Sequence, residues 1–485
     1  MKTTQLQAYL AAIEAPESEK QLFDRRLGLV VNVQEYQASS RMPRSWIGWS
    51  AKASNSLEFA SWQGERFGFG AALNQHDRAR RACVGEVAER YSGNAVPEQL
   101  LFSTAEKLRG QGVDVVDLQS FALYSQEQYR DPGFPFQPLM DSLEISWVIG
   151  MNLRTKQPVA LPASMAYLNF HRGERLSEPA LHALQYAGIA TGQSVEHAEH
   201  FALAELFERD ANTIWWASGA PAVRISDTQD FLDYHAIDGY DPVARKHSFP
   251  GELKVRLFSI PHQFGVPVVA AFIEDPVERL ISYGTACRPK PREAAAKALV
   301  EAFAMLELTA EVADPESNHW KALNRGELPQ QAFVPFREDR LYCNDFRGDY
   351  RDFVDLPMVA QLYLDPRMQA QPLDRLRPES HTDYPVTSFA EMPSIEGDWE
   401  SVRASYLDIL TRSGMECYSV DVSTSDVKKA GLSVVRVVAP GLYGNPPAAF
   451  PYLGGTRLYT IPQQLGMRDS VLTAEDLYPH PIPHV

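Results

Sequence analysis

Apolar and polar positions along the chain predict an alternation of helices and strands. Three long runs rich in alanine and leucine have the spacing of a buried helix, and we expect helices over 77–91, 195–216 and 291–311. Shorter runs rich in valine and isoleucine predict strands between and after them, at ISWVIGMNL, QPVALPASM, KVRLFSI, VPVVAAFI and LISYGTA. This interleaving is typical of an α/β or α+β fold.

Several expected helices carry start or stop signals. Ser194 is placed to cap the second long helix, and Pro291 to begin the third, where a missing N–H is harmless. A later helix in ESVRASYLDILTRSG should end at Gly414, because glycine readily adopts a left-handed cap. The last strands are expected in ECYSVDVS and LSVVRVVAPG.

Shifts in composition divide the chain into a short extension and one large domain. Residues 1–55 are mixed in character and too few for a typical domain, so we expect an N-terminal extension followed by one domain over 56–485. Within that domain, 365–396 is rich in Pro, Asp, Ser and Thr and predicts a long loop, of the kind that is a functional lid or disordered. A proline-rich tail, 478–485, closes the chain.

Two of the long helices repeat one acidic arrangement, in which two glutamates three positions apart are followed directly by an arginine. The residues are Glu86, Glu89 and Arg90 in the first helix, and Glu205, Glu208 and Arg209 in the second. Residues three apart share a helix face, and a duplicated strand–helix unit would explain the repeat. An exposed face of Glu–Arg pairs is the commonplace alternative, but the flanking residues are apolar, which favours burial.

Buried carboxylates need partners, because removing a charge from water is costly. Glu301, in the apolar run KALVEAFAML of the third helix, adds a fifth carboxylate. Together they could hold Mg²⁺, which binds few carboxylates and takes its other ligands from water and substrate phosphates. The two arginines could neutralise the carboxylates or bind phosphate oxygens. We therefore expect an acidic site for a divalent cation bound to a polyphosphate.

Other candidate groups are more simply explained as structural residues than as functional ones. His197 and His200 lie one turn apart but lack HExxH spacing, so a polar helix start is the simpler interpretation. The turn around Gly68 and Gly70 matches no specific phosphate loop. Cys83 could be a nucleophile, but a small buried core cysteine is more common. The chain shows no Ser-His-Asp signature.

Composition limits the partners and the compartment. The 485-residue chain is 45% apolar and has a net charge of −16, which disfavours binding to nucleic acid. Its four cysteines have neither metal-finger nor disulfide spacing, so a reducing cytoplasm is expected. The N-terminal residues lack the features of a signal peptide, and no apolar run is long enough to span a membrane.

Prolines at every second position stiffen the tail. Pro479, Pro481 and Pro483 favour an extended, polyproline-like rod. A rigid tail would be useful if it docked in a groove and fixed the position of its last residues. An ordinary surface tail, or a ligand for a proline-binding module, is equally compatible with these residues.

Several segments resemble the YcaO family. The central signature of that family is similar to GIATGQSVEHAEHFALAELFERDANTIWW, its first acidic helix to ARRACVGEVAERYSG and its third to KPREAAAKALVEAF. A late strand–turn–strand stretch resembles SVDVSTSDVKKAGLSVVRVVAPGLYG, and PHPIPHV resembles the PxPxP tail of azoline-forming members. The resemblance covers about 60–485.

This resemblance implies a YcaO fold that binds ATP and Mg²⁺ between its acidic helices. Azoline-forming members use ATP to activate a backbone amide of a ribosomal precursor peptide, so that a Cys, Ser or Thr side chain closes a thiazoline or oxazoline ring. The matching positions imply that Mg²⁺ or the nucleotide is bound by Glu86, Glu89, Glu205, Glu208 and Glu301. They also imply that Arg90 and Arg209 orient the phosphates or those carboxylates. The tail would lie near the active site and assist proton transfer through its backbone or terminal carboxylate, which makes its candidate catalytic residues Pro479, Pro481, Pro483 and Val485.

Six positions depart from the pattern of the family. In the glycine turn, Phe69 stands where many relatives have lysine, and Ala82 replaces a common serine before the first acidic helix. On the second helix, His197 and Phe201 occupy positions that are usually polar or acidic. On the third, Lys297 lies where glutamine is frequent and Ala304 where arginine is often found. Two interpretations follow: a divergent branch with its own nucleotide contacts, or a degenerate partner subunit.

Partners follow from the resemblance as well. We expect the precursor peptide, a separate E1-like (ocin-ThiF) protein that binds its leader, a flavin-dependent azoline dehydrogenase, and a homodimer of this chain within the hetero-complex. Two other functions stay open, namely another YcaO chemistry such as thioamide or amidine formation, and a peptide-binding scaffold. A metal-dependent hydrolase has only the carboxylates in its favour.

Overall fold

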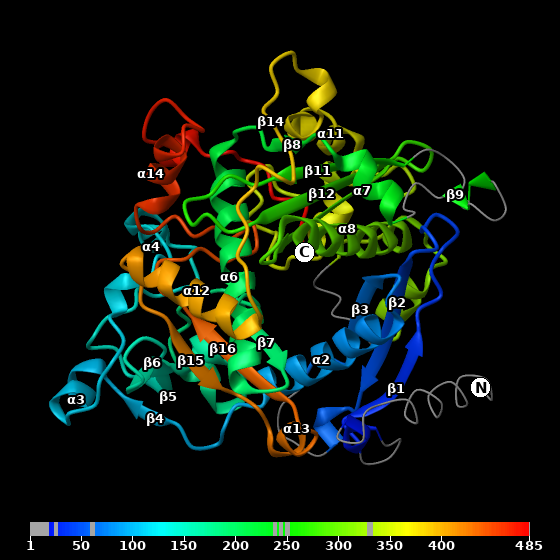
Figure 1. Cartoon of the computed structure of the whole chain (residues 1–485). Coiled ribbons are helices and arrows are strands. Elements are labelled where there is room, and N and C mark those ends of the chain that lie inside the picture. Colours follow the sequence, from blue (N-terminus) through cyan, green and yellow to red (C-terminus); the bar gives the residue numbers. More distant parts are fainter. Residues whose placement is uncertain are drawn as a thin grey trace.

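The computed structural model describes residues 19–23, 28–58, 64–235, 240–241, 246–247, 253–326 and 333–484. Their strands form a three-, a five- and a six-stranded sheet, together with a short ladder of β9 (Tyr240–Asp241) and β10 (Lys246–His247). Long helices pack on each of the three sheets (Figure 1). This mixture of helices and largely antiparallel sheets confirms the expected α/β (α+β) class.

The N-terminal sheet is a three-stranded antiparallel meander. Its strands are β1 (Val30–Glu35), β2 (Trp46–Ala53) and β3 (Phe67–Leu73), and α2 (His76–Asn94) packs across β2 and β3. Strands from both sides of residue 55 therefore share one sheet, while a domain boundary at that residue stays a prediction.

A five-stranded sheet carries the third acidic helix. The strand order is β13-β12-β11-β8-β14, and α8 (Pro291–Ala313) packs on β12 and β13. The strands are β8 (Val223–Ile225), β11 (Lys254–Ser259), β12 (Val268–Asp275), β13 (Leu280–Cys287) and β14 (Val386–Thr387). All pairs are antiparallel except that of β8 with β14.

The six-stranded sheet supports the second acidic helix, α6 (Val195–Ser218), which packs on β7 and β16. Its order is β4-β5-β15-β16-β7, with β6 paired to β5. The strands are β4 (Leu101–Ser103), β5 (Ile145–Asn152), β6 (Pro158–Pro162), β7 (Ile189–Gly192), β15 (Tyr418–Asp421) and β16 (Ser433–Val438). Because α6 also contacts β12 and β13, it links two sheets and stands upright in the middle of the molecule (Figure 1).

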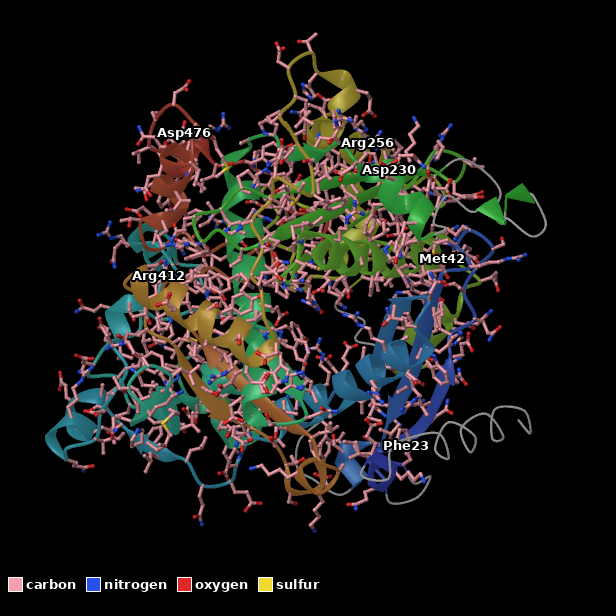
Figure 2. The ribbon with its side chains drawn as sticks, viewed as in Figure 1. Phe23, Met42, Asp230, Arg256, Arg412 and Asp476 are labelled. Carbon is pink, nitrogen blue, oxygen red and sulfur yellow. The ribbon has the colours of Figure 1, made fainter. Side chains whose placement is uncertain are left out.

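Shorter helices complete the described part of the chain. They are α3 (Ala105–Gly110), α4 (Gln126–Arg130), α5 (Ala163–Ala166), α7 (Thr228–Tyr234), α9 (Asn318–Asn324), α10 (Met358–Leu362), α11 (Pro366–Gln369), α12 (Trp399–Arg412), α13 (Ser425–Lys429) and α14 (Arg457–Gln464). Side chains fill the space between the ribbons, with Arg412 and Asp476 at the periphery (Figure 2).

The three long helices lie where the sequence predicts them, and so do their start signals. The Ser194 side chain accepts a hydrogen bond from the His197 N–H, and Pro291 occupies the first turn of α8. The later helix, α12, is followed by Gly414 at φ +72°. Residues 365–396 differ from a plain loop, because they contain α11, two 3-10 turns, β14 and buried apolar side chains such as Leu373.

Candidate active site

Five carboxylates from α2, α6 and α8 face one shared region. Burial is the main cause that raises the pKa of the Glu86, Glu89 and Glu208 carboxyls. A neighbouring carboxylate raises each pKa further: Glu301 acts on Glu86, and Glu205 acts on both Glu89 and Glu208. Like charges interact in this way only across short, poorly solvated distances. These pairwise interactions link Glu301 to Glu86, Glu86 to Glu89, Glu89 to Glu205 and Glu205 to Glu208, so the five glutamates that the sequence singles out form one connected set.

The first copy of the repeat is tied to strand β3 and to a neighbouring loop. Glu86 accepts a hydrogen bond of 2.9 Å from the Phe69 N–H on β3. Arg90 lies 3.4 Å from Glu86, 3.5 Å from Glu89 and 3.3 Å from Glu65. Its charge is therefore neutralised by carboxylates of the chain itself.

Glu89 is held in the neutral form more strongly than an ordinary glutamate. Burial, only partly opposed by Arg90, raises the pKa of its carboxyl to about 8, and Glu205 and Glu86 add to the effect. A carboxylate in this state would gain from a nearby cation, which favours its ionised form.

The second copy lies against two other strands. Glu205 accepts a hydrogen bond of 2.9 Å from the Gly188 N–H, just before β7. Glu208 accepts 2.7 Å and 3.2 Å bonds from the Thr285 hydroxyl and the Cys287 N–H on β13. Burial raises the pKa of the Glu208 carboxyl despite these donors and Arg209.

Glu301 differs from Glu86, Glu89 and Glu208 because the pKa of its carboxyl is lowered and not raised. It pairs with Lys297 one turn earlier on α8. Burial would raise the pKa of the Glu301 carboxyl, but Lys297, with weaker help from Arg209 and Arg288, holds that pKa below its usual value.

Close helix–strand approach places these groups. A Cβ at Gly70 of β3 would lie 2.2 Å from the Cys83 nitrogen on α2, and one at Gly284 of β13 would lie 2.4 Å from the Ala302 nitrogen on α8. Such distances exclude any side chain. Glycine thus lets each acidic helix rest directly on its strand, which brings the glutamates within reach of backbone N–H groups.

The proline-rich segment runs into the molecule along α6. Trp216 Nε1 donates to the His480 carbonyl at 2.8 Å, and the Tyr363 hydroxyl donates to the Pro481 carbonyl. Pro479 is exposed, whereas Pro481 and Pro483 are buried. Val485, the fourth candidate of this segment, lies outside the described residues.

His484, which the sequence did not single out as a site residue, reaches the second acidic motif. Its Nδ1 lies 2.7 Å from Arg209 Nη1, and its Nε2 lies 3.2 Å from the Thr285 hydroxyl oxygen. Its ring meets Tyr283 edge-on and is buried. No local pattern could have revealed this contact, because the two partners are far apart in the sequence.

Arg436 is a second functional candidate that the sequence analysis missed. It is buried on β16 and donates to the carbonyls of Gln185 and Tyr186. Burial lowers its pKa to about 10, while Glu205 and Glu89 oppose that shift. A charged residue inside the apolar run SVVRVV was the available signal.

A cavity of about 590 Å³ adjoins the acidic site, between β3, α7 and the starts of α2 and α8. Lys297 lines it and also pairs with Glu301, so the cavity and the site are contiguous. Arg78 and Arg292 add positive charge, and much of the remaining wall is apolar: Ala71, Leu73, Phe231, Ala296 and Val300.

Magnesium fits this donor set only as a shared ion. Within the described ranges, no three His, Cys, Asp or Glu side chains are grouped so that they could hold a metal ion. Mg²⁺ would instead take one or two carboxylates together with phosphate oxygens and water, a set it commonly uses. Burial raises the pKa of the Glu86, Glu89 and Glu208 carboxyls despite the neighbouring arginines, and a bound cation would favour their ionised forms.

The less favoured candidates lie in packed surroundings. His197 contacts Phe201 and Trp399, and His200 stacks on Tyr406. Cys83 is buried, and burial raises the pKa of its thiol well above the usual range. These environments favour structural roles over zinc binding or nucleophilic catalysis.

Comparison with known proteins gives this site its family context. Residues 70–443 match a family model described as YcaO cyclodehydratase, ATP- and Mg²⁺-binding. The chain belongs to the YcaO family. An uncharacterized protein of Methanothermobacter thermautotrophicus is 27% identical to this YcaO chain over 237 residues, which are 48% of the chain and 55% of that protein.

Solved structures confirm the predicted YcaO fold. A heterocyclase in complex with substrate and cofactor matches with a TM-score of 0.69 and 17% identity, over 98% of this chain and 57% of that one. YcaO from Methanopyrus kandleri, bound with AMPPCP and Mg²⁺, matches with a TM-score of 0.52 and 16% identity, over 91% and 90% of the two chains. The chain thus spans little more than half the length of the Methanothermobacter protein and of the heterocyclase.

A helix that spans a bilayer needs about 20 predominantly apolar residues. Among the residues that the structure describes, none of the helices is both long and apolar enough to cross a bilayer.

Proposed function

We propose that this chain is an ATP-dependent cyclodehydratase that converts Cys, Ser or Thr residues of a ribosomal precursor peptide into thiazolines or (methyl)oxazolines. The observation that carries the proposal is the convergence of five glutamates from three helices on one region, three of them with raised pKa values. Membership of a family described as ATP- and Mg²⁺-binding supports it.

Phosphate activation suits this chemistry, because an amide oxygen is a poor leaving group. ATP, when bound, would supply the phosphoryl group that lets this oxygen depart as phosphate after the side chain has attacked the carbonyl. Overall, the peptide loses one water for each ring, and ATP becomes ADP and phosphate. The protein then contributes chiefly positioning and charge stabilisation.

The roles of the residues follow from their surroundings. Glu86, Glu89, Glu205, Glu208 and Glu301 would bind Mg²⁺ or order its water, and Arg90 and Arg209 would orient the carboxylates or phosphate oxygens. The tail residues Pro479, Pro481, Pro483 and Val485 would lie near the reacting amide and assist proton transfer through the backbone or the terminal carboxylate. Contacts of the described tail residues with α6 support this placement.

The adjoining cavity offers a place for the nucleoside end of ATP. Apolar walls suit a base, and Lys297 and Arg78 would face the phosphates. We propose that the triphosphate extends from this cavity toward the five carboxylates.

Partners and compartment remain part of the proposal. By family resemblance, a separate E1-like protein would present the precursor peptide by its leader, a flavin-dependent dehydrogenase could oxidise the azolines, and the complex would work in the cytoplasm with this chain as a homodimer. Amide chemistry that yields thioamides or amidines is distinguished by product mass, because only cyclodehydration removes one water per ring.

A peptide-binding scaffold is the second candidate. It is favoured by Lys297, which differs from the glutamine frequent in the family and already forms an ion pair with Glu301. Calorimetric titration with Mg-ATP separates the two. We expect binding by the enzyme, and an absence of binding would favour the scaffold.

Glu208→Gln tests the enzyme directly. The amide keeps the shape of the carboxyl but not its charge, so ring formation should fall about 100-fold or more while the protein remains folded. Glu106→Gln, on the exposed face of α3, is the matched control and should behave as wild type. Full activity of Glu208→Gln, measured by product mass spectrometry, would refute the proposed function.

A further inference from the structure

The two arginines of the repeated motif hold different partners. Arg90 has three carboxylates within 3.3–3.5 Å. Arg209 lies farther from its own carboxylates, 3.6 Å from Glu205 and 3.9 Å from Glu208, and its 2.7 Å contact is with His484. The second arginine is therefore oriented by an imidazole, whereas the first is oriented by charge.

The contacts of His484 select one form of its ring. The Thr285 hydroxyl gives its proton to Glu208, so its oxygen is left to accept a hydrogen bond from His484 Nε2. Arg209 Nη1 lies 2.7 Å from Nδ1 and 3.2 Å from Nε2, and because a guanidinium can only donate, the nearer Nδ1 is assigned as its acceptor. The proton then sits on Nε2, which lies 3.2 Å from the Thr285 hydroxyl oxygen and can donate to it. Thr285 in turn donates to Glu208 at 2.7 Å. One neutral imidazole thus connects Arg209 and Glu208 from a segment outside α6.

The segment that carries the imidazole is anchored ahead of it. Tyr478 N–H donates to the Ala217 carbonyl at 2.8 Å, and Trp216 Nε1 donates to the His480 carbonyl. Pro483 and His484 are buried after these anchors. An anchored and buried side chain can hold its partners in place at little further entropic cost.

We propose that His484 is a positioning residue of the acidic site, whose neutral imidazole orients the Arg209 guanidinium and, through Thr285, the Glu208 carboxylate. The catalytic consequence rests on the proposed function. In the resting protein, His484 keeps Arg209 from closing fully onto Glu205 and Glu208. The guanidinium is thereby left directed for a phosphate oxygen, and both carboxylates are left available to Mg²⁺.

The kinetic test uses two substitutions at one position. His484→Leu removes both polar contacts, so kcat for ring formation should fall about 10- to 100-fold with little change in the KM for peptide. His484→Asn keeps an acceptor for Arg209 and a donor for Thr285, so it should recover a substantial part of the loss. His381→Leu, at an exposed histidine, is the matched control. Wild-type kinetics of His484→Leu, or equal loss in both variants, would overturn the proposal.

A readout without activity separates this inference from the proposed function. In the full-length protein labelled with ¹⁵N-histidine, the signals lost in His484→Leu identify the ring, which should show unprotonated Nδ1 and protonated Nε2. A protonated Nδ1 would overturn the assignment even if the enzyme is active. If the wild type forms no rings but shows this tautomer, the proposed function fails while the arrangement of His484 stands.

Discussion

At the scale of single residues, Glu89 is the clearest departure from ordinary solution behaviour. Its side chain is mostly buried between Arg90 and Glu205, and burial raises its pKa to about 8. A raised pKa means that the folded protein binds this proton more tightly than the unfolded chain does. Protonation of Glu89 therefore stabilises the fold.

Glu89→Gln should reveal this as a pH-dependent change in stability. The stabilisation by the proton is complete below the ordinary pKa of 4.5 and is lost as pH rises through about 8. Wild type and Glu89→Gln should thus unfold at similar temperatures at pH 5, and the variant should be more stable at pH 9, by about 2–4 kcal/mol at most. Thermal unfolding in the absence of nucleotide measures the difference, and a pH-independent difference would contradict the placement of Glu89.

Sequence reasoning reached the five glutamates but not their partners. The glutamates could be predicted because a three-residue spacing in an apolar helix constrains them to one face. Thr285 and His484 belong to other segments, and only the folded chain places them beside Glu208 and Arg209. The effect of Phe69 was likewise hidden, because it is the backbone N–H of this residue that serves Glu86.

At the scale of elements, the position of α8 depends on its contact with β13. A Cβ at Gly284 of β13 would lie 2.6 Å from the Ala298 carbonyl oxygen, and the other atoms nearest to it also belong to the backbone of α8. The helix and the strand must therefore separate to admit even a methyl group.

Gly284→Ala should destabilise the fold by about 1–3 kcal/mol and move Glu301 away from the other carboxylates. Chemical denaturation measures the first effect, and a rise in the KM for ATP would report the second. Gly348→Ala is the matched control, since a Cβ there meets nothing within 4 Å. Equal stability of the two variants would show that α8 is less constrained than its contacts indicate.

Arg375 connects a short helical segment to the end of α6. It donates to the carbonyls of Trp215 and Trp216, and its guanidinium lies 4.7 Å from the Trp216 ring centre and 5.1 Å from that of Tyr478. Burial lowers its pKa to about 10. The segment expected to be a loop is thus part of the support for the tail.

Arg375→Leu should loosen this support, because it leaves two helix carbonyls without their donor. The backbone amides of the four non-proline residues, Tyr478, His480, Ile482 and His484, should exchange with deuterium at least about tenfold faster, which mass spectrometry can follow. Arg412→Leu, at an exposed arginine of α12, is the control. Unchanged exchange in Arg375→Leu would mean that the tail is held without it.

The long helices and seven strands (β5, β6, β11, β12, β13, β15 and β16) were predictable because their apolar pattern extends over many residues. The strands of the N-terminal sheet, β1, β2 and β3, were not predicted. The short elements within 365–396 were not, since three- to six-residue turns carry no periodic signal and owe their form to packing on α6 and the five-stranded sheet. Strand order was also beyond the sequence, because distant segments such as β8 and β14 pair directly.

At the scale of the whole molecule, the cavity beside α8 lies between β3, α7 and the starts of α2 and α8, next to the acidic site. Ala296→Trp would fill part of its volume of about 590 Å³ from the helix side. The KM for ATP should rise about tenfold or more while kcat at saturation changes little, because the substitution competes with the nucleoside end. Steady-state phosphate release measures this, with Ala404→Trp at an exposed alanine of α12 as control. An unchanged KM would place the nucleoside elsewhere.

The contacts between the proline-rich segment and α6 also require two lengths to match, that of the helix between Trp216 and Arg209 and that of the segment between His480 and His484. From Trp216 to Arg209 the helix rises by about 10 Å, and four extended residues from His480 to His484 span about 12 Å. The two lengths agree only while the segment stays fully drawn out, which its alternating prolines enforce. One extra proline after Ile482 would carry the His484 imidazole about 3 Å past Arg209. A change in chain length alone, with every side chain retained, would then break the contact between His484 and Arg209.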